Sequence, residues 1–197
     1  MPDISETIQE AVEKAREQDS RFNSVIAALV AVAATFMALC NVKDGNIVQG
    51  MQQAQAKSID QWSYYQSKGT KLNMAENALD QLTLQKAITP AAAALIDVRI
   101  AVYQKQIVKY QSEKDAIRKS AEAAQKDYDA LNFHDDQFDM SDACLSVAIA
   151  LFGITALTRK RWLIFVACTF MALGVLFGLS GFLGWKIHPD FFARWLS

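Results

Sequence analysis

The stretch IAVYQKQIVKYQSEKDAIRKSAEAAQKDYDAL, residues 100–131, decides the fold. Apolar residues recur in it at alternating steps of three and four, which is the heptad seam of a coiled-coil helix. The seam residues are Ile100, Tyr103, Ile107, Tyr110, Lys114, Ile117, Ala121, Ala124, Tyr128 and Leu131. The stretch therefore predicts a long helix that packs along one side against a second helix.

A weaker seam upstream offers that second helix. Its residues are Val48, Met51, Gln55, Ser58, Trp62, Tyr65, Gly69, Leu72, Glu76 and Leu79. Thr89 is a natural N-cap, and Pro90 suits the first position of a helix, where its missing N–H costs nothing. We therefore expect residues 46–132 to form two helices folded back on each other at Thr89 and Pro90.

The two seams fit each other in an antiparallel register. The predicted pairs are Val48 with Leu131, Met51 with Tyr128, Trp62 with Ile117, Leu72 with Ile107, and Leu79 with Ile100. In the same register Gly69 leaves room for Tyr110, and Lys114 can lie on the ring of Tyr65. A heptad repeat would match by accident roughly one time in seven, so the fit supports the hairpin without proving it.

Three uncharged apolar blocks lie outside the predicted hairpin, at residues 22–42, 143–157 and 162–185. A membrane-spanning helix needs about 20 such residues. The middle block reaches that length if it is extended to Met140, and buried core helices are the alternative. The predicted fold class is an all-α membrane protein with three transmembrane helices and a long antiparallel coiled-coil hairpin between the first two.

The predicted segments follow from these blocks. They are a cytoplasmic amphipathic helix at 1–21, transmembrane helices at 22–42, 140–157 and 162–185, an extracytoplasmic helical hairpin at 43–139 with its turn at 88–90, a cytoplasmic basic loop at 158–161, and an interfacial C-terminal tail at 186–197. The first 21 residues are too long and too acidic for a signal sequence, so the first block is expected to be an uncleaved anchor. Lys43, Asp44 and Gly45 are a possible kink between this block and the hairpin.

The orientation rests on Arg159, Lys160 and Arg161, because short loops rich in Lys and Arg stay cytoplasmic. The hairpin and the C-terminus then lie on the other side, which is the periplasm if the source is a Gram-negative bacterium. An arm of about 43 residues would extend about 64 Å. A two-helix seam that is thin and partly polar favours lateral partners for such a stalk.

The third apolar block contains Gly174 and Gly178, four residues apart. Small residues at this spacing let helix backbones approach closely in a bilayer. Packing within one chain and packing between subunits both fit the motif.

Two groups of residues are candidates for a metal site and for a disulfide. The run from His134 to Asp142 could bind a divalent cation, but we favour a solvated loop with Asp139 or Ser141 as the N-cap of the next helix, and we predict no metal site. Cys40 and Cys144 lie near the same predicted boundary, so a disulfide is conceivable. Buried free thiols, Cys168 included, are the favoured interpretation.

No phosphate loop, catalytic triad, zinc spacing or haem signature is found, so we predict no enzyme and no cofactor. A net charge of −1 argues against a nucleic-acid partner. Ionisable residues are missing from the apolar blocks apart from Asp142 at one edge, which disfavours a pump.

Two stretches of the chain resemble sequences of a known protein family. They are the heptapeptide Trp62-Ser63-Tyr64-Tyr65-Gln66-Ser67-Lys68 and the stretch 134–162, which contains Ala148-Ile149-Ala150-Leu151 and Ala156-Leu157-Thr158-Arg159-Lys160-Arg161-Trp162. The chain resembles an uncharacterised bacterial three-span membrane-protein family, classed as a domain of unknown function, over nearly its whole length. This resemblance implies a bacterial inner-membrane protein and implies no activity.

The expected function is a non-enzymatic membrane protein whose periplasmic hairpin mediates self-assembly or association as an accessory or scaffold subunit of a membrane complex. Its expected partners are the lipid bilayer, further copies of the chain and other membrane subunits. The alternative is an oligomeric channel or transport component. It would need a polar line down a span, for which the candidates are Asn23, Ser24, Thr35 and Asn41 in the first and Ser146 and Thr155 in the second.

Overall fold

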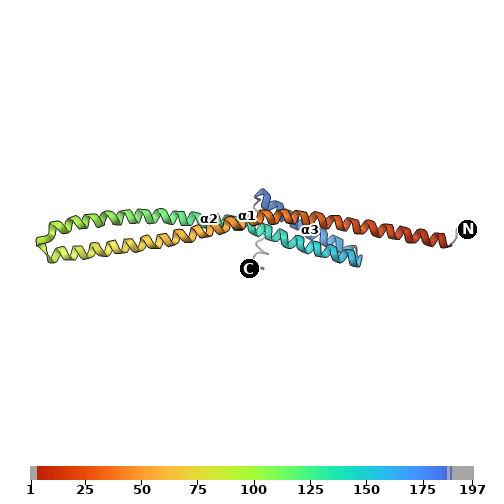
Figure 1. Cartoon of the computed structure of the whole chain (residues 1–197), viewed down its shortest axis with the longest axis horizontal. Helices are drawn as coiled ribbons and strands as arrows, with labels where there is room; N and C mark the ends of the chain where they lie inside the picture. The colour runs from red at the N-terminus through yellow and green to blue at the C-terminus, as the bar shows by residue number, and fades with distance from the viewer. Residues whose placement is uncertain (1–3, 186, 188–197) are drawn as a thin grey trace. The chain divides into compact units, whose positions relative to one another are not determined.

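The computed structural model describes residues 4–185 and residue 187, with side chains at 13, 16, 17 and from 20 onward. It contains the long helices α1 (Ile4–Ile88) and α2 (Ala93–Thr158), the short 3-10 helix η1 (Pro90–Ala92) between them, and α3 (Trp162–Leu183) (Figure 1). Over the described residues the chain is helical with no strand, so the all-α class is confirmed.

One proline sets the turn between the two long helices. Pro90 is the only proline between residues 3 and 188, and α1 ends two residues before it. Its ring excludes the helical conformation at the residue before it, and Thr89 accordingly has φ −127° and ψ 74°. Thr89 stands at the N-cap of η1, but its side chain makes no capping hydrogen bond.

α1 continues as one helix through Lys43, Asp44 and Gly45, so a kink there stays a prediction. One expected break in the helices is wrong. α2 runs through His134–Asp142, where we favoured a loop, so neither Asp139 nor Ser141 caps a helix. The predicted amphipathic face at residues 3–21 lies largely outside the described side chains.

The chain divides into two compact units, each described here by itself. Residues 49–131 form the hairpin, and residues 1–48 with 132–197 form the other, which we call the three-helix unit. The hairpin is shorter at both ends than the predicted segment 43–139, because residues 43–48 and 132–139 belong to the three-helix unit.

The three-helix unit packs parts of α1, α2 and α3 around a small apolar core. Ile26, Ala148, Phe152 and Ala167 form a buried cluster, with Phe22, Leu29, Val30, Leu151, Ala156, Cys168, Phe170 and Met171 packed against it. Each of the three helices contains a segment long and apolar enough to cross a membrane, judged by length and composition alone.

Three glycines of α3 set how closely that helix approaches α1 and α2. A Cβ on Gly174 would lie 2.7 Å from Leu145 Cγ, and one on Gly181 would lie 2.7 Å from Phe138 Cζ. A Cβ on Gly178 would lie 2.7 Å from Phe36 and 2.8 Å from the Ser141 hydroxyl. Ser141 also donates a hydrogen bond of 2.8 Å to the Gly174 carbonyl. Gly174 and Gly178 therefore pack against helices of the same chain, which is one of the two arrangements that fit their spacing.

Gly178→Ala should destabilise the three-helix unit, because the added methyl has no space between Phe36, Ser141 and Cys40. Overpacking of this kind costs about 1–3 kcal/mol. The measurement is the thermal unfolding temperature of the full chain in detergent. Gly153→Ala is the matched control: nothing lies within 4 Å of its Cβ position, so its unfolding temperature should be unchanged or higher.

Candidate interaction surface of the hairpin

The second arm of the hairpin buries one continuous side. Ile96, Ile117, Ala121 and Ala124 are buried, and the remaining predicted seam positions of α2 are half-buried: Ile100, Tyr103, Ile107, Tyr110, Lys114, Tyr128 and Leu131. All of them lie at alternating steps of three and four on the side of α2 that faces α1.

The first arm buries a side that is offset from the predicted one. Its buried and half-buried residues at heptad spacing are Met51, Ala54, Ser58, Gln61, Tyr65, Lys68, Leu72, Ala75, Leu79, Leu82 and Lys86. Every second position agrees with the predicted seam, Leu72 and Leu79 among them. At the seam positions between these, the residue turned toward α2 comes one residue earlier in the sequence than the predicted residue.

Trp62 shows the offset most clearly. It was expected to face Ile117, but it is 38 % exposed, and its ring packs edge-on against Tyr65 with the centroids 5.5 Å apart. Gln61 takes the more buried position beside it. The placement of Trp62 in the seam is therefore wrong.

Contacts across the hairpin lie close to the predicted register. Lys114 Nζ lies 4.8 Å from the centroid of the Tyr65 ring, so this predicted cation–π contact is confirmed. The Cβ position of Gly50 is 3.2 Å from Leu131. Gly69 faces the end of the Lys114 side chain and not Tyr110, because a Cβ there would lie 3.7 Å from Lys114 Nζ.

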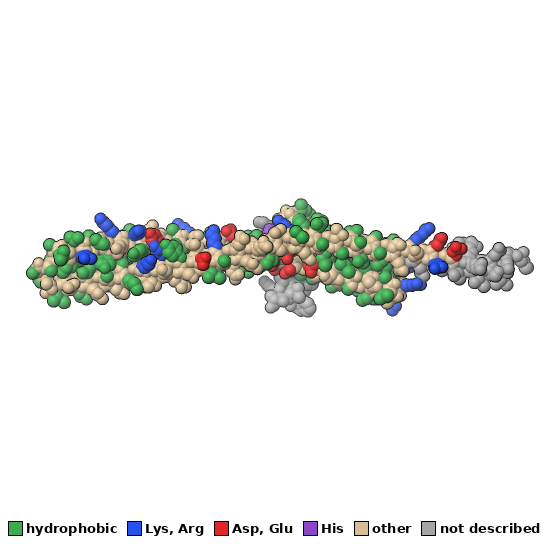
Figure 2. Space-filling view, viewed as in Figure 1, with side chains coloured by type: hydrophobic (Ala, Val, Ile, Leu, Met, Phe, Trp, Pro, Cys, Tyr) green, Lys and Arg blue, Asp and Glu red, His purple; other side chains and the backbone are tan. Residues whose placement is uncertain are grey.

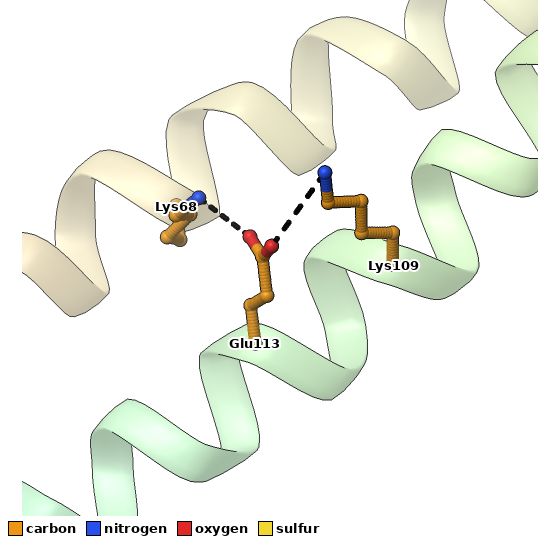
Figure 3. Close-up of polar contacts among 3 residues, drawn as sticks. All are labelled: Lys68, Lys109 and Glu113. Atoms are coloured by element: carbon orange, nitrogen blue, oxygen red, sulfur yellow. Dashed lines mark hydrogen bonds and ion pairs between the residues drawn. The ribbon is translucent and has the colours of Figure 1, made fainter.

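A partly buried ion pair joins the two arms near the middle of the hairpin (Figure 3). Lys68 on α1 is only 9 % exposed, and its Nζ donates to Glu113 Oε2 on α2 at 2.5 Å. The other carboxylate oxygen lies 3.9 Å from Lys109 Nζ. Lys68 Nζ also lies over the rings of Tyr64 and Tyr110, at 5.2 and 5.5 Å from their centroids. The cation is thus held by a carboxylate and two aromatic faces.

This pair favours the charged form of both groups. The hydrogen bond from Lys68 lowers the pKa of Glu113, and the hydrogen bond to Glu113 raises the pKa of Lys68. An acid with a lowered pKa stabilises the folded state above its ordinary pKa, about 4.3 for Glu, and that stabilisation is lost as the pH falls through the lowered value. The pair therefore contributes to the stability of the hairpin at neutral pH.

Glu113→Gln should lower the unfolding temperature of the hairpin, because it leaves Lys68 buried without its counter-charge. Limited proteolysis of the full chain in detergent, followed over a temperature series, measures this. Glu122→Gln is the control, since its ion pair with Arg118 is about half exposed on both sides. Exposed pairs contribute little, so equal resistance of the two variants would contradict a stabilising role for the buried pair.

Large apolar side chains remain exposed on the hairpin outside its seam. They are Ile59, Trp62, Tyr64, Met74, Leu84, Ile88, Leu95, Val98, Val102 and Val108. Figure 2 shows apolar side chains gathered toward the end of the hairpin where the chain turns. Exposed apolar side chains that gather in one region of a protein typically mark interaction sites, so the outer faces near the turn are the candidate site.

Charged residues flank this surface near the turn. Arg99 follows Val98 along the chain, and Lys86 forms an ion pair with Asp97 across the turn. A polar recess of about 270 Å³ lies next to it, lined by Ala78, Gln81, Leu82, Gln85, Arg99 and Tyr103.

The three-helix unit contains a buried glutamine that the sequence did not single out. The Gln137 side chain is fully buried on α2, and its Nε2 donates to the carbonyls of Trp185 at 2.8 Å and Ile187 at 2.7 Å. Its Oε1 lies 3.1 Å from His134 Nδ1. Gln137 therefore satisfies backbone carbonyls just beyond the end of α3, where Gly184 turns the chain with φ 66°.

Carboxylates gather in the same unit, on α1 and α2. Burial, with the negative charges of Asp139 and Asp44, raises the pKa of Asp135 to about 6. Burial also raises the pKa of Asp44, against a hydrogen bond to Asp135 that lowers it, and burial raises the pKa of Asp139.

The three-helix unit should lose stability as the pH rises from about 4 to about 7. An acid whose pKa is raised in the folded state binds its proton more tightly there, so its contribution is complete below the ordinary Asp pKa and is lost as the pH rises through about 6. Thermal unfolding in detergent at a series of pH values measures the slope. Asp135→Asn should flatten it, whereas Asp127→Asn, exposed on the hairpin, should leave it unchanged.

The remaining candidate residues have ordinary surroundings. All three cysteines are free thiols, and Cys40 Sγ lies 3.8 Å from Ser141 Oγ. Within the described part of the chain, no three His, Cys, Asp or Glu side chains converge in a way that could hold a metal ion.

The hydroxyl groups that are candidates for a polar line down a span form hydrogen bonds within the chain. Thr35 and Thr155 donate to carbonyls four residues earlier in their own helices, at 2.8 and 2.7 Å, and Ser24 does the same. Ser146 Oγ lies 3.7 Å from Met37 Sδ. These contacts satisfy the hydroxyls without any partner from a neighbouring subunit.

These features define an all-helical protein with a two-helix hairpin and three helices that are able, by length and composition, to cross a membrane. Residues 22–184 match the family described as a domain of unknown function, DUF4337, and the chain belongs to this family. No curated protein and no solved structure matches the chain.

Proposed function

We propose that this chain is a non-enzymatic multi-pass membrane protein whose hairpin stands outside the bilayer and holds the subunits of a membrane complex together. The three apolar helices support membrane insertion. The exposed turn at Arg159, Lys160 and Arg161, between α2 and α3, supports a cytoplasmic location for that turn. The hairpin then lies on the opposite side, the periplasm of a bacterial inner membrane.

The observation that carries this proposal is the exposed apolar surface of the hairpin. Leu84, Leu95 and Val98 are each more than half exposed, although they lie far along the chain from the three apolar segments. Outside a bilayer, a surface of this kind typically marks a site where another protein binds. The hairpin can present it, because the ion pair of Lys68 with Glu113 and the contacts of Lys68 with Tyr110 and of Lys114 with Tyr65 join its two arms.

The complex should be lost when the hairpin is opened. Leu72 is 8 % exposed in the seam, so Leu72→Glu places a charge between the arms and should separate them. Gln66→Glu, on an exposed position six residues earlier, is the matched control. Native mass spectrometry or sedimentation of the complex extracted in mild detergent gives its mass and composition.

We expect the wild-type chain and Gln66→Glu to give the same multi-subunit complex, and Leu72→Glu to give a smaller species that is still in the membrane fraction. A wild-type chain that sediments as a monomer without any co-purified subunit would overturn the proposed function. The same mass for all three proteins would show that the hairpin is not the assembly module.

A further inference from the structure

We propose that the hairpins of neighbouring copies of this chain dock side by side through two outward apolar stripes. The α1 stripe consists of Leu84 and Ile88, and the α2 stripe consists of Leu95, Val98 and Val102. All five residues are exposed. This inference rests on the proposed function and names a second copy of the chain as the partner.

The two stripes lie on opposite sides of the hairpin. Leu84 is two residues from the seam residues Leu82 and Lys86, and two residues along an α-helix are a rotation of about 200°. Val98 has the same relation to Ile96 and Ile100 in α2. Each stripe therefore points away from the opposite arm, and neither can be covered by its own hairpin.

The two stripes also lie at the same height along the hairpin. The ion pair between Lys86 and Asp97 marks one level across the two arms. Leu84 is two residues before Lys86, and Val98 is one residue after Asp97, so both lie within about one helical turn of that level. Ile88 and Leu95 lie on the side of it toward the turn.

Matched height favours a second copy, because two hairpins that lie parallel bring the α1 stripe of one level with the α2 stripe of the other. The residues between the first span and Leu84, 43–84, are as many as those between Val98 and the second span, 98–139. A parallel neighbour therefore brings its α2 stripe level with the α1 stripe, without any shift along the hairpin.

Charged residues flank both stripes. Asp97 and Arg99 lie on either side of Val98, and Lys86 lies two residues from both Leu84 and Ile88. Arg99 lines the polar recess with Gln81 and Gln85, and Lys86 and Asp97 form an ion pair within each hairpin. The stripes themselves contain no ionisable side chain. Docking would therefore bury apolar surface without leaving an unpaired charge from this pair.

A contact between two different stripes on opposite sides is heterologous. Each copy then offers its α1 stripe to one neighbour and its α2 stripe to the other, which builds a ring or a row and not a closed pair. A two-fold symmetric dimer would instead place like stripes together, for example Leu84 against Leu84 of the second copy. The two arrangements give different cross-links.

Cysteine cross-linking of the full chain in native membranes tests this arrangement. The variants are Leu84→Cys, Val98→Cys and the double variant, all in a Cys168→Ala background, since Cys40 and Cys144 are buried. The reagent is a short bifunctional maleimide. We expect a ladder of dimers, trimers and larger species from the double variant and no more than traces from either single variant or from the background chain.

Dimers from a single variant would overturn the heterologous arrangement in favour of a two-fold contact. No cross-link from the double variant, with the wild-type complex intact by mass, would overturn the inference while leaving the proposed function standing. A monomeric wild-type chain would overturn both.

A substitution that leaves the hairpin folded gives an independent reading. The Leu84 side chain is 66 % exposed in the wild-type chain. Leu84→Glu should therefore keep the wild-type helix content and protease resistance, while reducing the mass of the complex. Ser67→Glu, exposed on α1 further from the turn, is the control and should leave the mass unchanged. An unchanged mass for Leu84→Glu would count against the α1 stripe.

Discussion

The constraint on which the rest of the structure depends is the single proline between residues 3 and 188. Pro90 lacks a backbone N–H and excludes helix at the residue before it, so the chain must turn there. No comparable breaker occurs elsewhere in α1 or α2, and each helix continues from the hairpin into the three-helix unit. The position of this residue makes the two arms nearly equal, and equal arms place the two seams opposite each other.

The sequence predicts the second arm well and the first arm only in part, and the difference has a physical cause. In α2, every predicted seam position except Lys114 holds isoleucine, leucine, tyrosine or alanine, so only one set of heptad positions fits. In α1, the predicted seam and the side that is actually buried share Ser58, Tyr65, Leu72 and Leu79. They differ only at the heptad positions between these residues. Trp62 favours the wrong set of positions by its size, whereas the side actually buried there uses Gln61, Lys68 and Ala75. Small and charged residues at a helix contact give almost no hydrophobic signal.

The three-helix unit shows the same limit. The spacing of Gly174 and Gly178 indicates a close approach between helices, but it does not say which side chains fill the space. Leu145, Ser141 and Phe36 do so because α2 and α1 present them at that level. Gln137 could not be recognised in advance, because its partners are backbone carbonyls some 50 residues later, which no side-chain pattern encodes.

Gln137 also fixes the chain just beyond the end of α3. By holding the carbonyls of Trp185 and Ile187, it ties these two residues to the part of α2 that lies next to Asp135 and Asp136. In a topology map of this chain, a reporter fused directly after Ile187 and one inserted near Asp135 therefore test a single location.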